Sequence, residues 1–360
     1  MKKIAFVNIK GGVAKTASVT SVAHMLATQY NKRVLVVDLD PQANTTARFC
    51  NIDPFMRLER KLKGKVDVFD NSISTLLMNQ NMDVHTCILH TDYKNLDIIP
   101  SDLQLGEVQD QIKADVAIPP QFRLQRHIRA VEDEYDFCIM DCAPSISISN
   151  VNGLSVCDEV YIPTTTDGDS LEGIAYALNL IRTVQSYNYN LKICGCFLTR
   201  WENQGVTEVA NSLLNEMVPD LILPFRMYKS KLIGEGSYMN QPLLECDRNK
   251  NLSKLTMSYL HLTEYIMLDG KDKKEYLENY DEKKDLYLTV DQIENPEAEP
   301  LEEKHILQAE KIGIPVIKVK EGKGNKYSVV TGSRWYEVHK ELIKRGTWDK
   351  YRPIPVRVVG

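Results

Sequence analysis

The sequence lacks the features that would place the protein in a membrane, outside the cell or on a metal cluster. Its 360 residues contain no run of eighteen or more apolar residues, so no segment is predicted to span a bilayer. The apolar stretch at the N-terminus is too short for a signal peptide, which predicts a cytoplasmic protein. The eight cysteines form no C-x-x-C pair, and several lie inside apolar runs. We therefore expect reduced, mostly buried thiols rather than disulfides or a zinc site.

Positive charge is also in slight deficit. Lysine and arginine number 44 against 49 aspartate and glutamate, which gives a formal net charge of −5. A chain with this balance does not attract nucleic acid as a whole. Any DNA binding must therefore use a local basic patch, and it must weaken as salt is added.

What the sequence does contain is an alternation of short apolar runs with helical stretches. Continuous apolar runs predict strands buried on both faces of a sheet. These runs cover 3–7, 34–37, 96–99, 137–140, 160–162 and 193–198. Helical spacing separates them, for example over 16–29, 171–184 and 206–217. We therefore expect an α/β fold with a mostly parallel twisted sheet that is covered by helices on both faces.

Composition divides the chain into three parts. A first domain, 1–268, closes with an amphipathic helix over 252–268. Residues 269–284 are dominated by lysine, aspartate and glutamate, and they predict a charged linker or an exposed helix. Apolar patterning resumes over 285–360, with strands expected at 286–293, 315–319, 327–330 and 354–359. This last part predicts a separate small α/β domain.

The segment between the first strand and the first helix is rich in glycine. A glycine-rich loop offers backbone N–H groups to phosphate oxygens, and the following helix N-terminus adds partial positive charge. Lys15 would reach the β- and γ-phosphates, and the Thr16 hydroxyl would bind Mg²⁺. Against the common pattern G-x-x-x-x-G-K-[ST], Ile9 and Ala14 replace both glycines. Against the deviant form K-G-G-x-G-K-T, the segment differs only at Ala14.

That deviant form resembles the ParA/MinD group of P-loop ATPases. Residues 34–42, which end in Asp38-Leu39-Asp40-Pro41-Gln42, are similar to the second signature of that group. Residues 137–145, which include Asp141, are similar to its Walker B strand and switch. An acidic residue at the end of a central strand lies beside the phosphate loop, where it can hold Mg²⁺ through water. Together with residues 161–173 and 223–242, the resemblance covers about residues 1–268.

The resemblance implies an ATP- and Mg²⁺-dependent homodimer that hydrolyses ATP slowly, with ATP between the two subunits. It implies that Lys10 crosses to the phosphates of the partner, that Asp40 positions water and that Asp38 is structural. The metal would be held by Thr16 and Asp141. The implied nucleotide-binding residues are Lys10, Gly11, Gly12, Val13, Ala14, Lys15, Thr16, Ala17 and Pro224. Pro224 belongs to a segment expected to be a loop that packs near the adenine.

The departure at Ala14 leaves a second interpretation open. If the backbone there needs a positive φ, the added methyl group costs about 1–3 kcal/mol. This would weaken nucleotide binding roughly ten- to a hundredfold and would slow or abolish hydrolysis. The chain would then be a non-catalytic nucleotide-sensing regulatory or interaction protein.

Members of the group that bind DNA use basic residues on the dimer surface. The candidates here are Arg226, Lys229, Lys231, Arg248, Lys250 and Lys254. Each could contact a DNA phosphate without reading the base sequence, although ordinary solvated side chains are the alternative. The implied role is a nucleoid-associated partition protein that positions DNA cargo, with a ParB-like or centromere-binding partner.

The last domain resembles the ParB/sulfiredoxin-like domain over 285–293, 326–335 and 353–356, with Gly332 and Arg334 at its strand-to-helix turn. The alternative is a small domain that only binds a partner protein.

A MinD-like membrane function is disfavoured, because 354–359 is strand-like rather than a basic amphipathic helix. An iron–sulfur reductase is disfavoured, because Cys138 lies in a predicted core strand.

Overall fold

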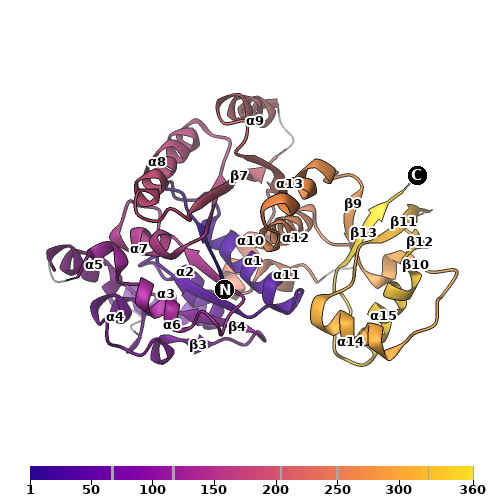
Figure 1. Ribbon diagram of the computed structural model, residues 1–360, viewed down its shortest axis with the longest axis horizontal. Coiled ribbons are helices and arrows are strands. Elements are labelled where there is room, and N and C mark those ends of the chain that lie inside the picture. The colour runs from indigo at the N-terminus through magenta and orange to yellow at the C-terminus, as the bar shows by residue number, and fades with distance from the viewer. Residues whose placement is uncertain (66–68, 116–117, 203–204, 249–250, 323, 360) are drawn as a thin grey trace. The chain divides into compact units, whose positions relative to one another are not determined.

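The computed structural model describes residues 1–65, 69–115, 118–202, 205–248, 251–322 and 324–359. It contains two compact units, which are described separately (Figure 1). The first unit comprises Met1–Ala27 and Lys32–Cys246, and the second comprises Thr28–Asn31 and Asp247–Gly360.

The first unit is built on an eight-stranded sheet with the strand order β3-β4-β2-β5-β1-β6-β7-β8. The strands are β1 Lys2–Phe6, β2 Val34–Asp38, β3 Leu89–His90, β4 Leu96–Ile99, β5 Phe137–Asp141, β6 Glu159–Thr164, β7 Lys192–Trp201 and β8 Ile222–Tyr228. Neighbouring strands run parallel, except that β3 pairs antiparallel with β4. The mostly parallel sheet predicted from the continuous apolar runs is therefore confirmed.

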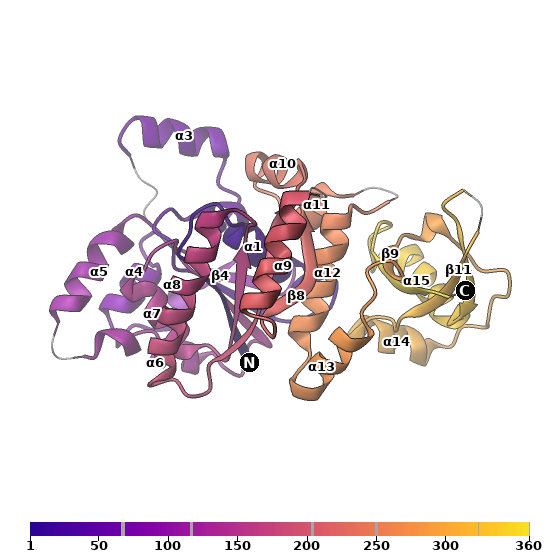
Figure 2. The ribbon, with the colours of Figure 1, turned by 90° about the horizontal axis from the view of Figure 1, so that it is seen from above.

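Helices flank this sheet (Figure 2). They are α1 Lys15–Thr28, α2 Asn44–Phe49, α3 Pro54–Leu62, α4 Ile73–Met78, α5 Gln104–Ala114, α6 Gln125–Ala130, α7 Ile148–Val156, α8 Gly168–Gln185, α9 Gly205–Met217, α10 Leu232–Met239 and α11 Leu243–Cys246. Two 3₁₀ turns are η1 Val84–Cys87 and η2 Pro120–Phe122. Every residue of β2 and β5 is buried, as expected for central strands covered on both faces.

The second unit has a five-stranded sheet with the order β10-β12-β11-β13-β9. Its strands are β9 Asp285–Leu288, β10 Ile293–Glu294, β11 Ile317–Glu321, β12 Tyr327–Thr331 and β13 Ile354–Val358. Its helices are α12 Lys254–Met267, α13 Gly270–Asn279, α14 Glu303–Ile312 and α15 Ser333–Lys344, with the 3₁₀ turn η3 Val290–Gln292. Ile317, Val319 and Val356 pack with Tyr336 of α15 in its core.

Two sequence-based predictions about strands are wrong. Residues 286–293 do not form one strand, because η3 interrupts them and separates β9 from β10. Residues 223–226 are not a loop, because they lie within the edge strand β8. The exposed Pro224 is tolerated there. Proline has no backbone N–H, and an edge strand has one side on which no neighbouring strand needs that donor.

The compact units place α12 with the second unit, whereas the sequence places 252–268 at the end of the first domain. Residues 269–284, expected as a charged linker or helix, contain α13. The domain limits 1–268, 269–284 and 285–360 stay predictions.

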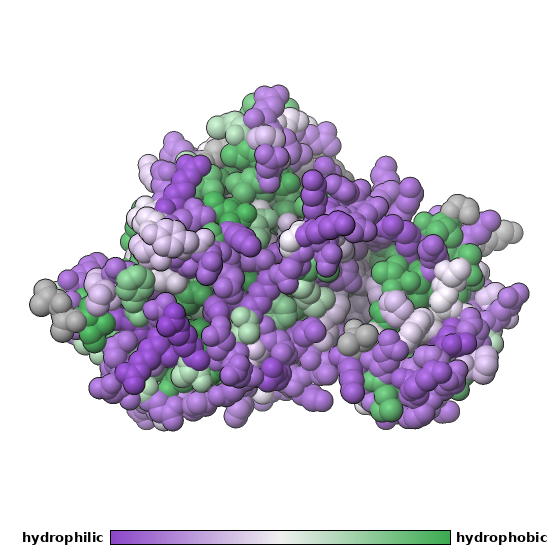
Figure 3. Space-filling view, viewed as in Figure 1, coloured by the Kyte–Doolittle hydropathy of each residue, from purple (hydrophilic) through white to green (hydrophobic). Residues whose placement is uncertain are grey.

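Within the described residues, every helix is too short or too polar to cross a bilayer. Hydrophilic side chains cover most of the face shown in Figure 3.

Candidate functional site

The phosphate loop and two aspartates meet at one edge of the large sheet. The register pairs Phe6 of β1 with Asp141 of β5, and Asp38 of β2 with the same Asp141. Because these strands are parallel and adjacent, the loop after β1 begins beside both carboxyl groups. This is the carboxyl edge at which α/β proteins bind their ligands.

The loop contains two residues with left-handed backbone. Gly12 has φ +77° and Ala14 has φ +64°. The carbonyl of Ala14 accepts hydrogen bonds from the Ser18 N–H at 2.9 Å and the Ser18 hydroxyl at 2.8 Å, which joins the loop to α1. Ala14 therefore has the positive φ that disfavours a residue with a Cβ. This conformation costs about 1–2 kcal/mol.

Lys15 lies across the loop and is 7% exposed. Its Nζ donates a hydrogen bond of 2.8 Å to the carbonyl oxygen of Lys10. Burial lowers the pKa of Lys15, while the charges of Asp141 and Asp40 oppose that shift. A buried ammonium group that bonds a loop carbonyl is well placed to exchange that partner for a phosphate oxygen.

Asp141 is buried with one carboxylate oxygen unsatisfied. Its Oδ2 accepts hydrogen bonds from the hydroxyls of Thr16 at 2.9 Å and Thr45 at 2.5 Å. Its Oδ1 is buried and has no hydrogen-bond partner among the described residues. A hydroxyl and an unsatisfied carboxylate oxygen are the hard oxygen ligands that Mg²⁺ prefers, so these residues fit the metal.

Asp38 holds the segment that carries Asp40. Its Oδ2 accepts hydrogen bonds from the backbone N–H and the hydroxyl of Thr46, at 2.9 and 2.7 Å. Its Oδ1 accepts from the Asp40 N–H at 3.1 Å. Burial and the nearby Asp141 raise the pKa of Asp38 to about 8, and burial raises the pKa of Asp141 to about 6. Asp40 is half-buried, and its Oδ1 accepts from the Gln42 N–H at 2.9 Å.

Lys10 is held by acidic and hydroxyl groups within its own chain. Its Nζ forms an ion pair with Asp167 and lies 3.1 Å from the Ser170 hydroxyl. The Thr165 hydroxyl donates a hydrogen bond of 2.5 Å to Asp167. Although burial opposes the shift, the hydrogen bonds from Lys10 and Thr165 lower the pKa of Asp167 to about 2. Asp167 is therefore ionised at neutral pH.

Arg200 lies beside the loop at the end of β7. Its Nη2 is 3.8 Å from the position that a Cβ on Gly12 would occupy. The neighbouring Thr199 hydroxyl donates to the carbonyl of Val13 at 3.3 Å, which joins β7 to the loop. Arg200 has φ +53° and is exposed, and no hydrogen bond or ion pair of its side chain is found among the described residues.

Sequence reasoning missed Arg200, Asp167 and Thr45. Thr45 and Asp167 follow β2 and β6, and Arg200 lies at the end of β7, so the position of each residue near the carboxyl end of a strand was the available signal. It is a weak signal, because many polar residues follow strands in any α/β protein.

The basic residues proposed for DNA binding have neighbours of several kinds. The Arg226 guanidinium lies 4.4 Å from the centre of the Trp201 ring. Lys229 pairs with Glu202 at 3.0 Å, and Lys231 pairs with Glu235 at 3.5 Å. Arg248 and Lys254 are exposed in the second unit, and Lys250 lies outside the described residues.

The strand-to-helix turn expected in the C-terminal part joins β12 to α15. Gly332 has φ +92°, a conformation that favours glycine, and it precedes the first residue of the helix. The following Arg334 forms an ion pair with Glu299 at 3.1 Å. This arginine is therefore already neutralised within its own unit.

Comparisons with known proteins agree with the geometry of the first unit. The profile of the AAA domain family matches residues 1–193. The sporulation initiation inhibitor protein Soj from Bacillus subtilis is 32% identical over 275 residues, which cover 75% of this chain and 99% of Soj.

Solved structures share the fold. Apo McdA from Cyanothece superposes with a TM-score of 0.62 at 18% identity, covering 74% of this chain and 100% of that one. Cobyrinic acid a,c-diamide synthase from Mycobacterium smegmatis, solved with an ATP analogue and magnesium, has a TM-score of 0.58 at 22% identity. It covers 74% of this chain and 94% of the synthase. At these identities the likeness is one of fold alone.

Proposed function

This chain belongs to the ParA/Soj family of P-loop partition ATPases, and from that membership we propose that it is an ATP-driven dimer that segregates DNA. It is an ATPase, and its cofactors are ATP and Mg²⁺. We propose the dimer, nonspecific DNA binding and a nucleoid-associated location. A ParB-like or centromere-binding protein is the proposed partner.

The observation that carries this proposal is the unsatisfied Oδ1 of Asp141 beside Thr16 and the intact loop. In the proposed site, Thr16 and Asp141 hold Mg²⁺, and Lys15 binds the phosphates. Bound Mg²⁺ neutralises phosphate charge. Loop residues 10–17 surround the phosphates, while Pro224 contacts the base.

The proposed catalytic groups are Lys10, Lys15 and Asp40. Asp40 is half-buried, and it lies near enough to Lys15 to influence the pKa of that lysine. A carboxylate at this position can orient the attacking water. Lys10 leaves Asp167 and directs its charge at the phosphates bound by the partner subunit, where it stabilises charge that develops during transfer.

The test combines an ATP titration with a measurement of molecular mass. We expect the native protein to bind Mg·ATP and to become a dimer. Lys15→Ala should lose nucleotide binding, because it removes the buried cation of the loop. Lys10→Ala should bind ATP and stay monomeric. Calorimetry and sedimentation velocity measure the two properties, and ATP-dependent dimers of equal strength in native protein and Lys10→Ala would refute the role of Lys10.

A second candidate function follows from the left-handed Ala14: a regulatory nucleotide sensor whose ATP hydrolysis is too slow to drive a partition cycle. Phosphate release separates the two candidates. The partition ATPase predicts that native protein releases phosphate faster than Asp40→Ala does. Equal, background rates in both proteins, with ATP binding intact, would favour the sensor.

We propose that the C-terminal unit is a ParB-like module fused to the ATPase. The support is the Gly332 turn between β12 and α15, which matches the expected strand-to-helix motif. Nucleotide binding by this module would use Arg334, which must first leave Glu299. Glu299→Gln should therefore strengthen the binding of a nucleotide to this unit, measured in a Lys15→Ala background that silences the P-loop. If Glu299→Gln leaves the affinity unchanged, Arg334 does not bind the nucleotide.

A further inference from the structure

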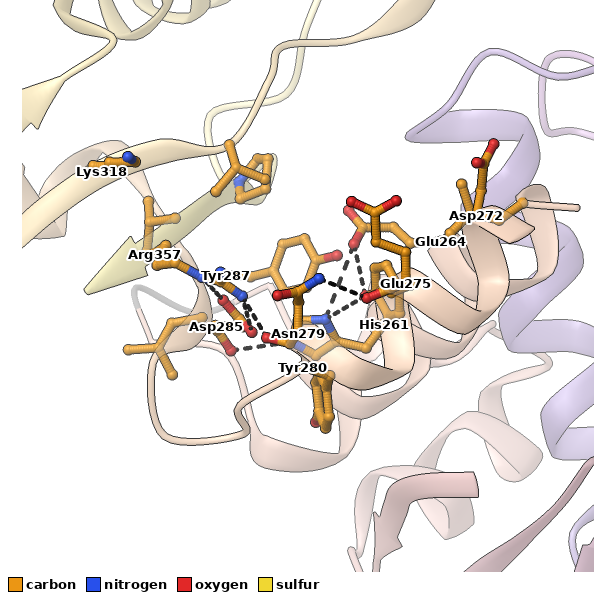
Figure 4. Close-up of a pocket in the computed structure, with 16 residues that line it drawn as sticks. His261, Glu264, Asp272, Glu275, Asn279, Tyr280, Asp285, Tyr287, Lys318 and Arg357 are labelled. Carbon is orange, nitrogen blue, oxygen red and sulfur yellow. Dashed lines mark hydrogen bonds and ion pairs between the residues drawn. The ribbon is translucent and has the colours of Figure 1, made fainter. Parts of the chain in front are cut away.

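The second unit contains a cavity of about 510 Å³ between α12, α13 and one face of its sheet (Figure 4). Pockets that enclose small molecules span about 300–1,000 Å³. The sheet contributes Asp285, Tyr287, Lys318 and Arg357 to the wall. The register places Lys318 beside Arg357, and Arg357 beside Asp285, in one row across three strands. Apolar residues that alternate with this row face the opposite core, so the cavity lies on the second face of the sheet.

The cavity has aromatic walls. Tyr276 of α13 and Tyr280, which follows this helix, have nearly parallel rings with an interplanar angle of 15° and centres 6.3 Å apart. The His261 ring is 5.0 Å from Tyr280 and 4.9 Å from Tyr287. Burial lowers the pKa of His261, whose ring nitrogens lie 3.0 Å from the Tyr276 hydroxyl and from the Asp285 carbonyl. The histidine is therefore a neutral part of the wall at physiological pH.

Most of the charge that remains in the cavity is negative. Arg357 and Asp285 neutralise each other through two contacts of 2.6 and 2.7 Å. Glu264 and Glu275 lie together on the helical side of the cavity, and Lys318 lies on the sheet side (Figure 4). Among the described residues, no lysine or arginine forms an ion pair with either glutamate. Asp272 also lines the cavity, and the nearest ring nitrogen to Glu264 belongs to His261, at 4.0 Å, so the carboxylates of this side outnumber the cations.

Neutral hydroxyl groups hold Glu264 in place. Its two oxygens accept hydrogen bonds from Tyr30 at 3.1 Å and from Tyr276 at 3.0 Å. The Tyr287 hydroxyl also lines the cavity, is buried with the residue 3% exposed, and lies beside Tyr30 and Glu264. A hydroxyl oxygen can accept a hydrogen bond from an ammonium group. The site thus combines fixed acceptors with aromatic faces, which attract cations.

We propose that this cavity binds an organic cation, an amine or guanidinium group on an apolar body. Such a group could belong to a free small molecule or to a lysine or arginine side chain of a peptide. Its charge would lie beside Glu264 and Glu275, and its apolar part against the tyrosine rings. The residues of this cavity belong to the second unit, whereas the P-loop belongs to the first.

The test uses the full chain without nucleotide and a matched pair of probes. Benzylamine should bind, and benzyl alcohol, which has the same ring without the charge, should bind at least about tenfold more weakly. N-acetyl-arginine amide tests the peptide source: tighter binding than benzylamine indicates a protein side chain, and weaker binding indicates a free amine. Equal affinity for benzylamine and benzyl alcohol would overturn the proposal.

Variants assign the binding to this cavity. Glu264→Gln and Glu275→Gln should each weaken benzylamine binding by about tenfold. Glu278→Gln is the control, because Glu278 is exposed on the same helix and does not line the cavity. Lys318→Gln should tighten binding, and this exposed residue can change without disturbing the packing. If Glu264→Gln, Glu275→Gln and Lys318→Gln all bind benzylamine as the native protein and the Glu278→Gln control do, the amine binds elsewhere and the proposal fails.

Discussion

Ala14 is the residue at which the sequence departs from the deviant Walker pattern, and the loop nevertheless adopts the left-handed backbone there. Because the left-handed backbone at Ala14 is part of how the loop joins α1, we expect its cost to fall on folding rather than on ATP binding. Ala14→Gly should therefore stabilise the fold by about 1 kcal/mol, with little change in ATP affinity. Urea unfolding and calorimetry measure the two effects. A tenfold gain in ATP affinity would show that the methyl group obstructs the phosphates instead.

Asp167 predicts a second effect at the residue scale. Its ion pair with Lys10 competes with any contact of Lys10 across a dimer. Asp167→Asn should weaken that competition. The ATP concentration needed to form dimers should then fall by about two- to fivefold, because a partly exposed ion pair is weak. Sedimentation velocity across an ATP series measures this shift. Asp169→Asn is the matched control, because Asp169 is an exposed neighbour on α8 with no ion pair to Lys10 among the described residues. If Asp167→Asn needs more ATP than the native protein to form dimers, then Asp167 supports the active position of Lys10.

Asp38 predicts how stability depends on pH. Its pKa in the folded protein is about 8, above the ordinary value of 3.8, so the folded state binds a proton that the unfolded chain releases. Stability should therefore fall as pH rises from about 4 to 8, and Asp141, at about 6, acts in the same direction over the lower part of this range. Asp38→Asn cannot ionise, so its stability should fall less between about pH 5 and 8. Urea unfolding without Mg²⁺ at both pH values tests this, and parallel losses in the two proteins would contradict it.

The residues that the sequence located are those tied to strand ends. Lys15, Thr16 and Asp141 follow or end apolar runs, and parallel pairing brings such positions together. Asp167 is 157 residues from Lys10, and no local sequence pattern predicts their ion pair. The pairing of Thr45 with Asp141 depends in the same way on how α2 returns to the sheet. Side-chain partners of this kind come from tertiary packing, which periodicity does not encode.

At the scale of elements, the central strands could be predicted and the edges could not. Central strands such as β2 and β5 are continuous apolar runs, whereas β3 has two residues and β8 contains an exposed proline. Edge strands face solvent on one side, so their apolar pattern is weaker. The interruption of 286–293 by η3 was missed because a 3₁₀ turn leaves hydrophobic content unchanged.

Helix α7 predicts a packing effect. A Cβ on Gly153 would lie 2.4 Å from Cδ1 of Leu39, which follows β2 near the site. Gly153→Ala should therefore destabilise the protein by about 1–3 kcal/mol. Gly106→Ala on α5 is the control, since no atom lies within 4 Å of its added Cβ, and it should stabilise by up to about 1 kcal/mol through helix propensity. Thermal unfolding compares them, and a Gly153→Ala protein as stable as Gly106→Ala would show that Leu39 moves aside freely.

At the scale of the whole molecule, the net charge of −5 sets the conditions for DNA binding. Binding should need ATP and should weaken linearly in log K with log salt. Lys231→Ala should lower affinity equally for all sequences and reduce the magnitude of the salt slope by about one. Fluorescence anisotropy with two unrelated duplexes, from low to moderate salt, measures this. A slope unchanged by Lys231→Ala would remove this lysine from the interface.

The bond between the Lys15 ammonium and the carbonyl of Lys10 also bears on the speed of nucleotide capture. Since the lysine rests on the backbone of its own loop, an arriving phosphate replaces one hydrogen bond and need not wait for the loop to fold. Association should then follow a single exponential whose rate rises in proportion to ATP concentration, without a plateau. A plateau at high ATP concentration would show instead that the loop must change its conformation before it can bind.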